Sequence, residues 1–338
     1  MFALKRNKSG STKLAMAGLA ALMVILSACG DNNAGNAANS TAGSTTAPSA
    51  EATAAPSQGE AKTVTDAMGH QVSIPVNPQR VLASYLEDHL VTLGVKPVAQ
   101  WSVPNGIQEY LSPELKEVPT ISYDLPLEAV TSFAPDLIIV DSESAVQNGL
   151  YDQYNKIAPT YVLGDAVNKD WRKALTTIGD LLGKSAEAAQ AIKDYDQKAA
   201  EAKEKLASVA GGQSAAALWL VQKNFYLVDE TRASGEVLYK DLGLASPNLV
   251  TEIPADQRAT WNPISLEKLS ELKADHIFLV NSDKSDSSEI LNSATWKSIP
   301  AVKAGHVYEL SSNSTWLYSG ATADSKTIDD ILKFLVKQ

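Results

Sequence analysis

The longest uninterrupted helical pattern in this chain runs from Ser185 to Val209, near its middle. It contains no proline or glycine, and its apolar positions recur in steps of three and four, at Ile192, Tyr195, Ala199, Ala202, Leu206 and Val209. This spacing places them on one face of an α-helix, with Ser185 as a candidate N-cap and Gly211 as its end. About 25 residues at a rise of 1.5 Å each predict a rod roughly 37 Å long, as long as a small domain is wide.

Similar stretches of sequence lie on both sides of this rod. Residues 125–140 and 264–280 each begin a short helix with Leu-Glu, carry an Asp eight positions after the Glu, and end in a run of large apolar residues. A run that is apolar at every position is typical of a strand buried on both faces of a parallel sheet. A second matched pair, residues 90–97 and 238–247, shares a Leu-Gly-aliphatic helix end before a proline. The repeats predict an α/β chain of two similar lobes with parallel-rich central sheets, joined by one long rigid helix.

The first 28 residues have the pattern of an export signal. An apolar core at residues 14–26, too short to span a bilayer, follows four cations, Lys5, Arg6, Lys8 and Lys13. Cys29 is the only cysteine of the chain and comes after Leu-Ser-Ala. This context resembles a bacterial lipobox, in which the cysteine receives a lipid and becomes the mature N-terminus. The resemblance implies a protein that is anchored to a membrane through Cys29 and does not span it.

Composition sets the remaining boundaries. Residues 29–62 are rich in small and polar residues and have almost no large apolar side chain, which predicts a flexible tether. We expect an N-terminal lobe over 63–184, the linking helix over 185–210, and a C-terminal lobe with a closing helix over 211–338. With one cysteine there is no disulfide framework, so core burial must supply the stability.

The charge and the missing motifs exclude several functions. The net charge of −10, with no basic block after the signal, argues against nucleic acid as a partner. The four histidines, at positions 70, 89, 276 and 306, share no metal-ligand spacing. There is no nucleophile elbow, phosphate loop or dinucleotide fingerprint. Nothing in the sequence points to an enzyme, a resident cofactor or a metal held directly by the protein.

The chain has only five arginines, so each is a candidate for a specific role. Arginine offers a planar, charge-assisted hydrogen-bonding fork that lysine lacks. Arg80, at the start of a predicted strand, is interpreted as structural. Arg172, Arg232 and Arg258 lie at predicted helix starts or in loops, and Arg232 is the first choice among them for binding.

Taken in order, the lipobox, the tether, the two lobes, the linking helix and the repeated Leu-Glu units resemble the substrate-binding lipoproteins of Gram-positive ABC importers for iron–siderophores. The similarity covers the body from Val64 to the end. It implies a periplasmic-binding-protein-like fold of the helical-backbone type, with one ligand in the interlobe cleft and modest closure. It also implies a monomer on the outer face of the cell membrane that delivers its ligand to an ABC permease.

The identity of the ligand stays open at this point. Proteins for haem, cobalamin and ferric citrate share the two-lobed plan and are alternatives of the same class. A lipid-anchored cell-surface enzyme or interaction protein is the alternative of another class. The sequence does not name the siderophore.

Two segments most resemble the hydroxamate-siderophore binders, Thr231–Tyr239 and Ser314–Tyr318. In such proteins the arginine donates to hydroxamate oxygens and the aromatic rings pack on the carbon skeleton. The resemblance therefore implies ligand contacts at Arg232, Trp316 and Tyr318, and secondarily at Trp101, Arg172, Arg258 and Trp261. Core packing is the preferred interpretation of Trp219 and Trp296. Catecholate binders often carry an arginine where this chain has Asn281-Ser-Asp-Lys284, which disfavours a triscatecholate unless Lys284 substitutes.

The repeated glutamates, Glu128 and Glu267, lie at matching positions, one in each lobe. An acidic residue in the first turn of a helix is favoured by the helix dipole alone, by a few tenths of a kcal/mol. In the resembling family the glutamate at this place docks into arginine pockets of the membrane permease. We therefore expect Glu128 and Glu267 to be the permease contacts.

Overall fold

The computed structural model describes residues 61–104, 106–259 and 261–336. The export signal, Cys29 and nearly all of the predicted tether lie outside the described residues. Within the described part, no helix combines the length and the apolar character that a membrane crossing requires. The described residues all fall in one compact unit of the chain, Pro56–Gln338.

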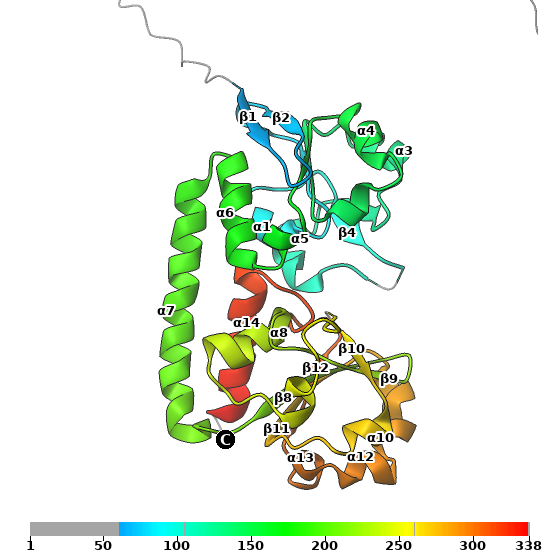
Figure 1. The fold of residues 1–338 in the computed structure, drawn as a ribbon, viewed down its shortest axis with the longest axis vertical. Coiled ribbons are helices and arrows are strands. Elements are labelled where there is room, and N and C mark those ends of the chain that lie inside the picture. Colours follow the sequence, from blue (N-terminus) through cyan, green and yellow to red (C-terminus); the bar gives the residue numbers. More distant parts are fainter. Residues whose placement is uncertain (1–60, 105, 260, 337–338) are drawn as a thin grey trace, which may run out of the picture. The chain divides into compact units, whose positions relative to one another are not determined.

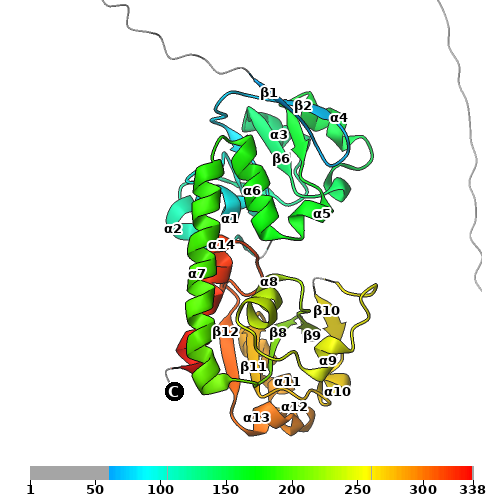
Figure 2. The same cartoon turned by 60° about the vertical axis from the view of Figure 1, so that its left-hand side comes forward.

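The rod is helix α7 (Ser185–Ala210), which runs along both lobes in Figures 1 and 2. Its buried face contains Tyr195, Ala199, Ala202 and Leu206, as the spacing predicts. Two details differ. Lys184 takes the N-cap position and Ser185 is already helical. Val209 is 47% exposed and Ala210 is buried in its place, because four positions after Leu206 the helix returns closer to the same face than three positions do.

The N-terminal lobe begins with an antiparallel hairpin of β1 (Lys62–Thr65) and β2 (Gln71–Ile74), turning at Gly69 with φ +88°. Its central sheet is parallel in the order β3-β6-β7, formed by Val81–Leu82, Leu137–Val140 and Thr160–Val162. A second parallel pair joins β4 (Gln100–Ser102) to β5 (Thr120–Ser122). The helices are α1 (Glu87–Thr92), η1 (Glu109–Leu111), α2 (Ser112–Leu115), α3 (Leu127–Ser132), η2 (Glu143–Val146), α4 (Leu150–Asn155), α5 (Asp165–Asn168) and α6 (Trp171–Leu181).

The C-terminal lobe has one five-stranded sheet in the order β10-β9-β8-β11-β12. Its strands β8, β11 and β12 are parallel, and β9 and β10 are antiparallel additions. The strands are β8 (Ala215–Val221), β9 (Asn224–Leu227), β10 (Asn262–Ile264), β11 (His276–Asn281) and β12 (Val307–Ser311). The helices are α8 (Ala233–Gly235), the π-helical turn η3 (Glu236–Asp241), α9 (Asn248–Thr251), α10 (Leu266–Leu269), η4 (Lys284–Ser287), α11 (Ser288–Leu291), α12 (Ala294–Ser298), α13 (Pro300–Lys303) and α14 (Ala321–Leu335).

The repeated helix–turn–strand units form as predicted, α3 before β6 and α10 before β11, and both strands are fully buried. The structure also explains the repeated aspartate. The Asp136 carboxylate accepts the N–H groups of Gln79 and Arg80 at 2.7 and 3.0 Å. The Asp275 carboxylate accepts the N–H of Ser214 at 2.7 Å. In each lobe the aspartate therefore ties the start of its own strand to the start of the neighbouring parallel strand, β3 or β8.

The closing helix α14 contacts both lobes. It packs against α7 and against α1 of the N-terminal lobe. One hydrophobic core runs through residues of both lobes, α7 and α14, including Leu90, Tyr195, Phe278 and Ile328. Ala323 of α14 also packs with Tyr110, Leu111, Leu115 and Val118 of the N-terminal lobe. The lobes are thus joined by a packed pair of helices.

Candidate ligand-binding pocket

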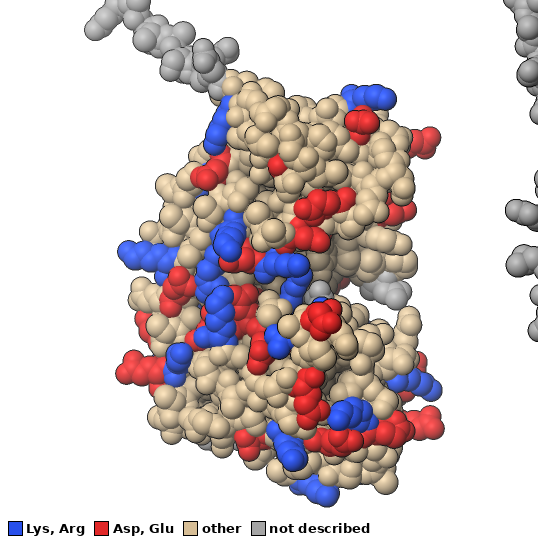
Figure 3. Space-filling view, in the orientation of Figure 1, with Lys and Arg blue, Asp and Glu red and all other residues tan. Residues whose placement is uncertain are grey.

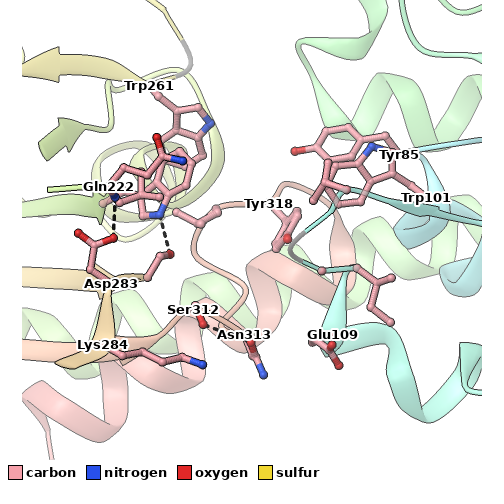
Figure 4. Close-up of a pocket in the computed structure, with 17 residues that line it drawn as sticks. Tyr85, Trp101, Glu109, Gln222, Trp261, Asp283, Lys284, Ser312, Asn313 and Tyr318 are labelled. Carbon is pink, nitrogen blue, oxygen red and sulfur yellow. Dashed lines mark hydrogen bonds between the residues drawn. The ribbon is translucent and has the colours of Figure 1, made fainter. Parts of the chain in front are cut away.

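A pocket of about 650 Å³ lies between the lobes, with walls from both (Figure 4). Its C-terminal-lobe wall consists largely of residues at or just after the carboxyl ends of β8, β11 and β12. Its N-terminal-lobe wall includes Tyr85, Trp101 of β4 and the segment around Ile107. Parallel strands place their carboxyl ends at one edge of a sheet, and ligands of open α/β sheets bind outside that edge. The fold therefore brings these loops together although they are far apart in sequence.

Aromatic rings form two groups on the pocket walls. On one side, Tyr85 packs on Trp101 with ring centroids 5.0 Å apart, and Tyr318 lies 6.3 Å from Tyr85. On the other, Trp219 and Trp261 meet edge to face at 5.2 Å. Figure 4 shows Trp261 on one side of the pocket and Tyr85 with Trp101 on the other. Such walls offer broad apolar surface with polar edges.

Several polar groups of the pocket make hydrogen bonds within the protein. The Trp219 indole N–H donates to the Ser282 hydroxyl at 2.9 Å. The Asp283 carboxylate accepts the N–H groups of Gln222 and Lys223, both at 2.6 Å. Desolvation raises the pKa of the Tyr318 hydroxyl, with the Glu109 and Glu87 carboxylates adding to the shift, so the group stays a hydrogen-bond donor at neutral pH.

The pocket carries little charge. Among the described residues that line it, Lys284 is the one cation, and Glu109 and Asp283 are the two acids. Elsewhere, opposite charges are interspersed on the face shown in Figure 3. No group of three or more histidine, cysteine or acidic side chains in the described ranges is arranged to hold a metal ion.

Three of the residues expected to contact a ligand line this pocket, namely Trp101, Trp261 and Tyr318. Lys284, considered as a substitute cation, lines it too. Trp316 does not, which corrects the expectation for this residue. Its side chain is 1% exposed, stacks on Phe278 with centroids 4.6 Å apart, and donates its indole N–H to Asp330 at 3.1 Å. The side chain fills the core between the sheet and α14.

Arg172 is also placed differently from the expectation. Its guanidinium donates to Asp196 of α7 at 2.8 Å and to Asp241 of η3 at 3.4 Å. It lies over the rings of Trp171 and Tyr195, 4.6 and 4.9 Å from their centroids. Arg172 therefore connects α6 of the N-terminal lobe to the linking helix and to the C-terminal lobe, and it is not among the residues that line the pocket.

The other two arginines lie outside the pocket lining as well. Arg258 pairs with Glu230 at 3.5 Å and donates to the Ile253 carbonyl. Arg232 is the N-cap residue of α8 and is partly exposed. The next residue, Ala233, donates its N–H to the Ser319 hydroxyl at 3.1 Å, beside Tyr318. Of the three candidate arginines, Arg232 thus adjoins a residue that is bonded to the pocket segment of Tyr318. Arg172 and Arg258 form ion pairs with acidic side chains.

Sequence reasoning missed several lining residues. Trp219, interpreted as core, is only partly buried and lines the pocket near the carboxyl end of β8. That position is a sequence signal that could have identified it. Tyr85 adopts φ +66°, a conformation that its sequence does not indicate. Trp296 is confirmed as core, 4% exposed and stacked on Phe225.

Glu128 and Glu267 lie in the first turns of α3 and α10, as the repeat predicts. Both side chains are exposed. The two carboxylates therefore occupy matching places in the two repeated units and are available to a partner.

Proteins of known family resemble this chain in sequence. A family model described as "Periplasmic binding protein" matches residues 83–314. The iron(3+)-hydroxamate-binding protein YxeB of Bacillus subtilis is 28% identical over 276 residues, covering 79% of this chain and 83% of the relative. The iron(3+)-hydroxamate-binding protein FhuD of the same organism is 28% identical over 295 residues, covering 86% of this chain and 87% of the relative.

Solved structures agree with this assignment. The crystal structure of Staphylococcus aureus SirA complexed with staphyloferrin B superimposes with a TM-score of 0.69 at 28% identity, covering 81% of this chain and 98% of that one. The two lobes, the parallel-rich sheets and the long linking helix predicted from the sequence are confirmed by the structure. With the family model matching well over half of its residues, the chain belongs to the periplasmic binding protein family.

Proposed function

We propose that this protein is a receptor that binds a ferric siderophore in the pocket between its lobes and delivers it to an ABC permease for iron uptake. The observation that carries the proposal is the pocket of about 650 Å³, with aromatic walls from both lobes and little charge. A bulky complex with a carbon skeleton around a shielded metal fits such walls. The relatives named for iron(3+)-hydroxamates support the same ligand class.

The low charge of the pocket favours a hydroxamate complex over a more anionic one. Each hydroxamate carries a single negative charge, so a full set balances the ferric ion, whereas dianionic catecholates leave a large excess of negative charge. Moving an unbalanced charge out of water is costly unless opposite charges meet it. Lys284 alone among the described lining residues could do so, against Glu109 and Asp283. Haem, cobalamin and ferric citrate remain the alternative ligands.

The direct test is a fluorescence titration with ferric hydroxamate, catecholate and citrate complexes and their iron-free forms. Three of the chain's six tryptophans line the pocket, so a ferric complex bound there should quench emission at micromolar concentration. We expect the ferric hydroxamate to bind tightest and the triscatecholate weakest. Trp219→Phe should reduce the quenching, and Trp296→Phe, in the core, should leave the fractional quenching by ligand largely intact. Absence of quenching by every ferric siderophore would contradict the proposal.

The arginines give a second test by substitution. We propose that Arg232 reaches the oxygens around the iron from its place beside the wall. Arg232→Ala should then weaken binding by roughly 1.5–3 kcal/mol, the scale of a hydrogen bond to a charged group. Arg172→Ala should instead lower the free energy of unfolding, since it leaves Asp196 and Asp241 without their cation, and Arg258→Ala serves as the matched control. Calorimetric binding and urea unfolding separate these effects, and equal affinities for all three variants would remove Arg232 from the site.

We propose further that the protein is anchored through lipidated Cys29 on the outer face of the membrane, acts as a monomer, and docks through Glu128 and Glu267. Fixed charges at an interface set orientation and register more than raw affinity. The double variant Glu128→Ala with Glu267→Ala should bind siderophore normally but fail to support uptake by cells. The matched control replaces other exposed acids, Glu114 and Glu289, with alanine. Normal uptake by the double variant, or a loss of its ligand affinity, would show that these residues are not the permease contacts.

A further inference from the structure

Helix α1 opens with two consecutive buried carboxyl groups that belong to no function described above. Glu87 is 1% and Asp88 is 3% exposed. Burying a carboxyl group is costly unless hydrogen bonds meet it. Each carboxyl group accepts main-chain N–H bonds from a different distant segment. Each of those segments contains or adjoins an aromatic residue that lines the pocket.

Glu87 is bonded to the main chain of Trp101. One carboxyl oxygen, Oε1, accepts the main-chain N–H of Trp101 at 2.6 Å. The other, Oε2, is buried and has no hydrogen-bond partner among the described residues. Tyr85, two residues before Glu87, packs on the ring of Trp101. The Glu87 carboxyl thus joins the start of α1 to Trp101, in addition to the pairing of β4 with β5, and keeps Trp101 beside Tyr85.

Asp88 is bonded to the main chain just after Tyr318. Its Oδ1 and Oδ2 accept the N–H groups of Thr322 and Ala323 at 3.1 and 3.0 Å. These groups open α14, whose own N-cap residue, Gly320, has no side chain to cap them. Asp88 therefore caps α14 from across the lobe junction, and a Cβ atom at Gly320 would collide with its carboxylate. Since Tyr318 lies just before this start of α14, the cap fixes the end of the Tyr318 segment.

We propose that Glu87 and Asp88 are a positioning pair that fixes Trp101 and Tyr318 beside Tyr85 on one side of the pocket, and so sets ligand affinity. This rests on the proposed function of the pocket. The alternative is that the two carboxyl groups serve stability alone. Asp136 is an example of a carboxylate of that stabilising kind. It accepts the N–H groups of Gln79 and Arg80 and joins the starts of two strands, and none of these residues lines the pocket.

The buried pair is costly to ionise. Burial raises the pKa of Glu87 to about 7 and that of Asp88 to about 6, against the opposing effect of their main-chain hydrogen bonds. A carboxyl whose pKa is raised on folding contributes most to stability below its unfolded pKa, and that contribution is lost as the pH rises through the folded pKa. Above pH 7 the ionised pair therefore costs stability. The hydrogen bonds to Trp101, Thr322 and Ala323 hold these segments in place although the ionised pair lowers stability.

The experiment compares substitutions of similar size that keep or remove the acceptor atoms. Glu87→Met removes the acceptor of the Trp101 N–H, and Asp88→Asn removes one of two acceptors at α14. Each should weaken binding of the tightest ferric hydroxamate about tenfold, because the pocket loses a preorganised aromatic side chain before the ligand binds. Glu87→Gln keeps a side-chain carbonyl and should restore most of the affinity that Glu87→Met loses. Asp136→Asn, the matched control, should lower thermal stability and change affinity less than about twofold.

Amide hydrogen exchange without ligand tests the positioning itself. Glu87→Met should speed exchange at Trp101, Asp88→Asn at Thr322 and Ala323, and Asp136→Asn at Gln79 and Arg80 only. If the wild type binds no ferric siderophore, the proposed function fails while exchange still decides whether the pair holds these segments. The positioning proposal is overturned if exchange at Trp101, Thr322 and Ala323 is unchanged. It is also overturned if exchange changes but folded Glu87→Met and Asp88→Asn bind a ferric hydroxamate like the wild type, or if Asp136→Asn weakens binding equally.

Discussion

The packing of α14 against α7 and α1 is the constraint on which the rest of the structure depends. It buries apolar side chains of both lobes in one continuous core, which is present in addition to a separate hydrophobic cluster within each lobe. Separating the lobes widely would expose that core to water at about 25 cal/mol for each Å² of apolar surface. The pocket therefore lies between walls whose separation is limited by packing, and ligand capture is expected to need only small movements of the walls.

Within this constraint, the binding surface is aromatic and carries few charges. The walls are assembled from strand ends of two separate sheets, and Asp283 and Trp219 already make contacts within the protein. A ligand meets broad ring surface together with polar groups, such as the Tyr318 hydroxyl and Lys284, at its edges. A pocket of this kind selects by size and by the net charge of the complex more than by a dense set of specific hydrogen bonds.

The architecture was predictable because it follows from local periodicity. The apolar spacing of α7 and the fully apolar runs of β6 and β11 each identify an element without knowledge of its neighbours. The repeated Asp136 and Asp275 were visible as a pattern, but their role became clear only when the neighbouring strand starts were in place. The export signal and Cys29 remain predictions from sequence alone.

The site was predictable only in part, because residue type does not say which way a side chain points. Trp316 and Trp219 are the clearest case: the former is buried against Phe278, and the latter faces the pocket. Arg172 matched the chemistry of a ligand contact, yet three acidic neighbours from α7 and η3 hold it in an ion-pair network. Such outcomes depend on contacts between segments far apart in sequence.

The central claim is that aromatic residues of both lobes enclose a ferric siderophore. The most direct measurement is a crystal structure of the protein soaked with a ferric hydroxamate, with the iron located by its anomalous scattering. The account predicts a single iron peak between the Tyr85–Trp101 wall and the Trp219–Trp261 wall, with Tyr318 beside the ligand. An iron peak elsewhere on the protein, with the pocket between the lobes empty, would contradict it.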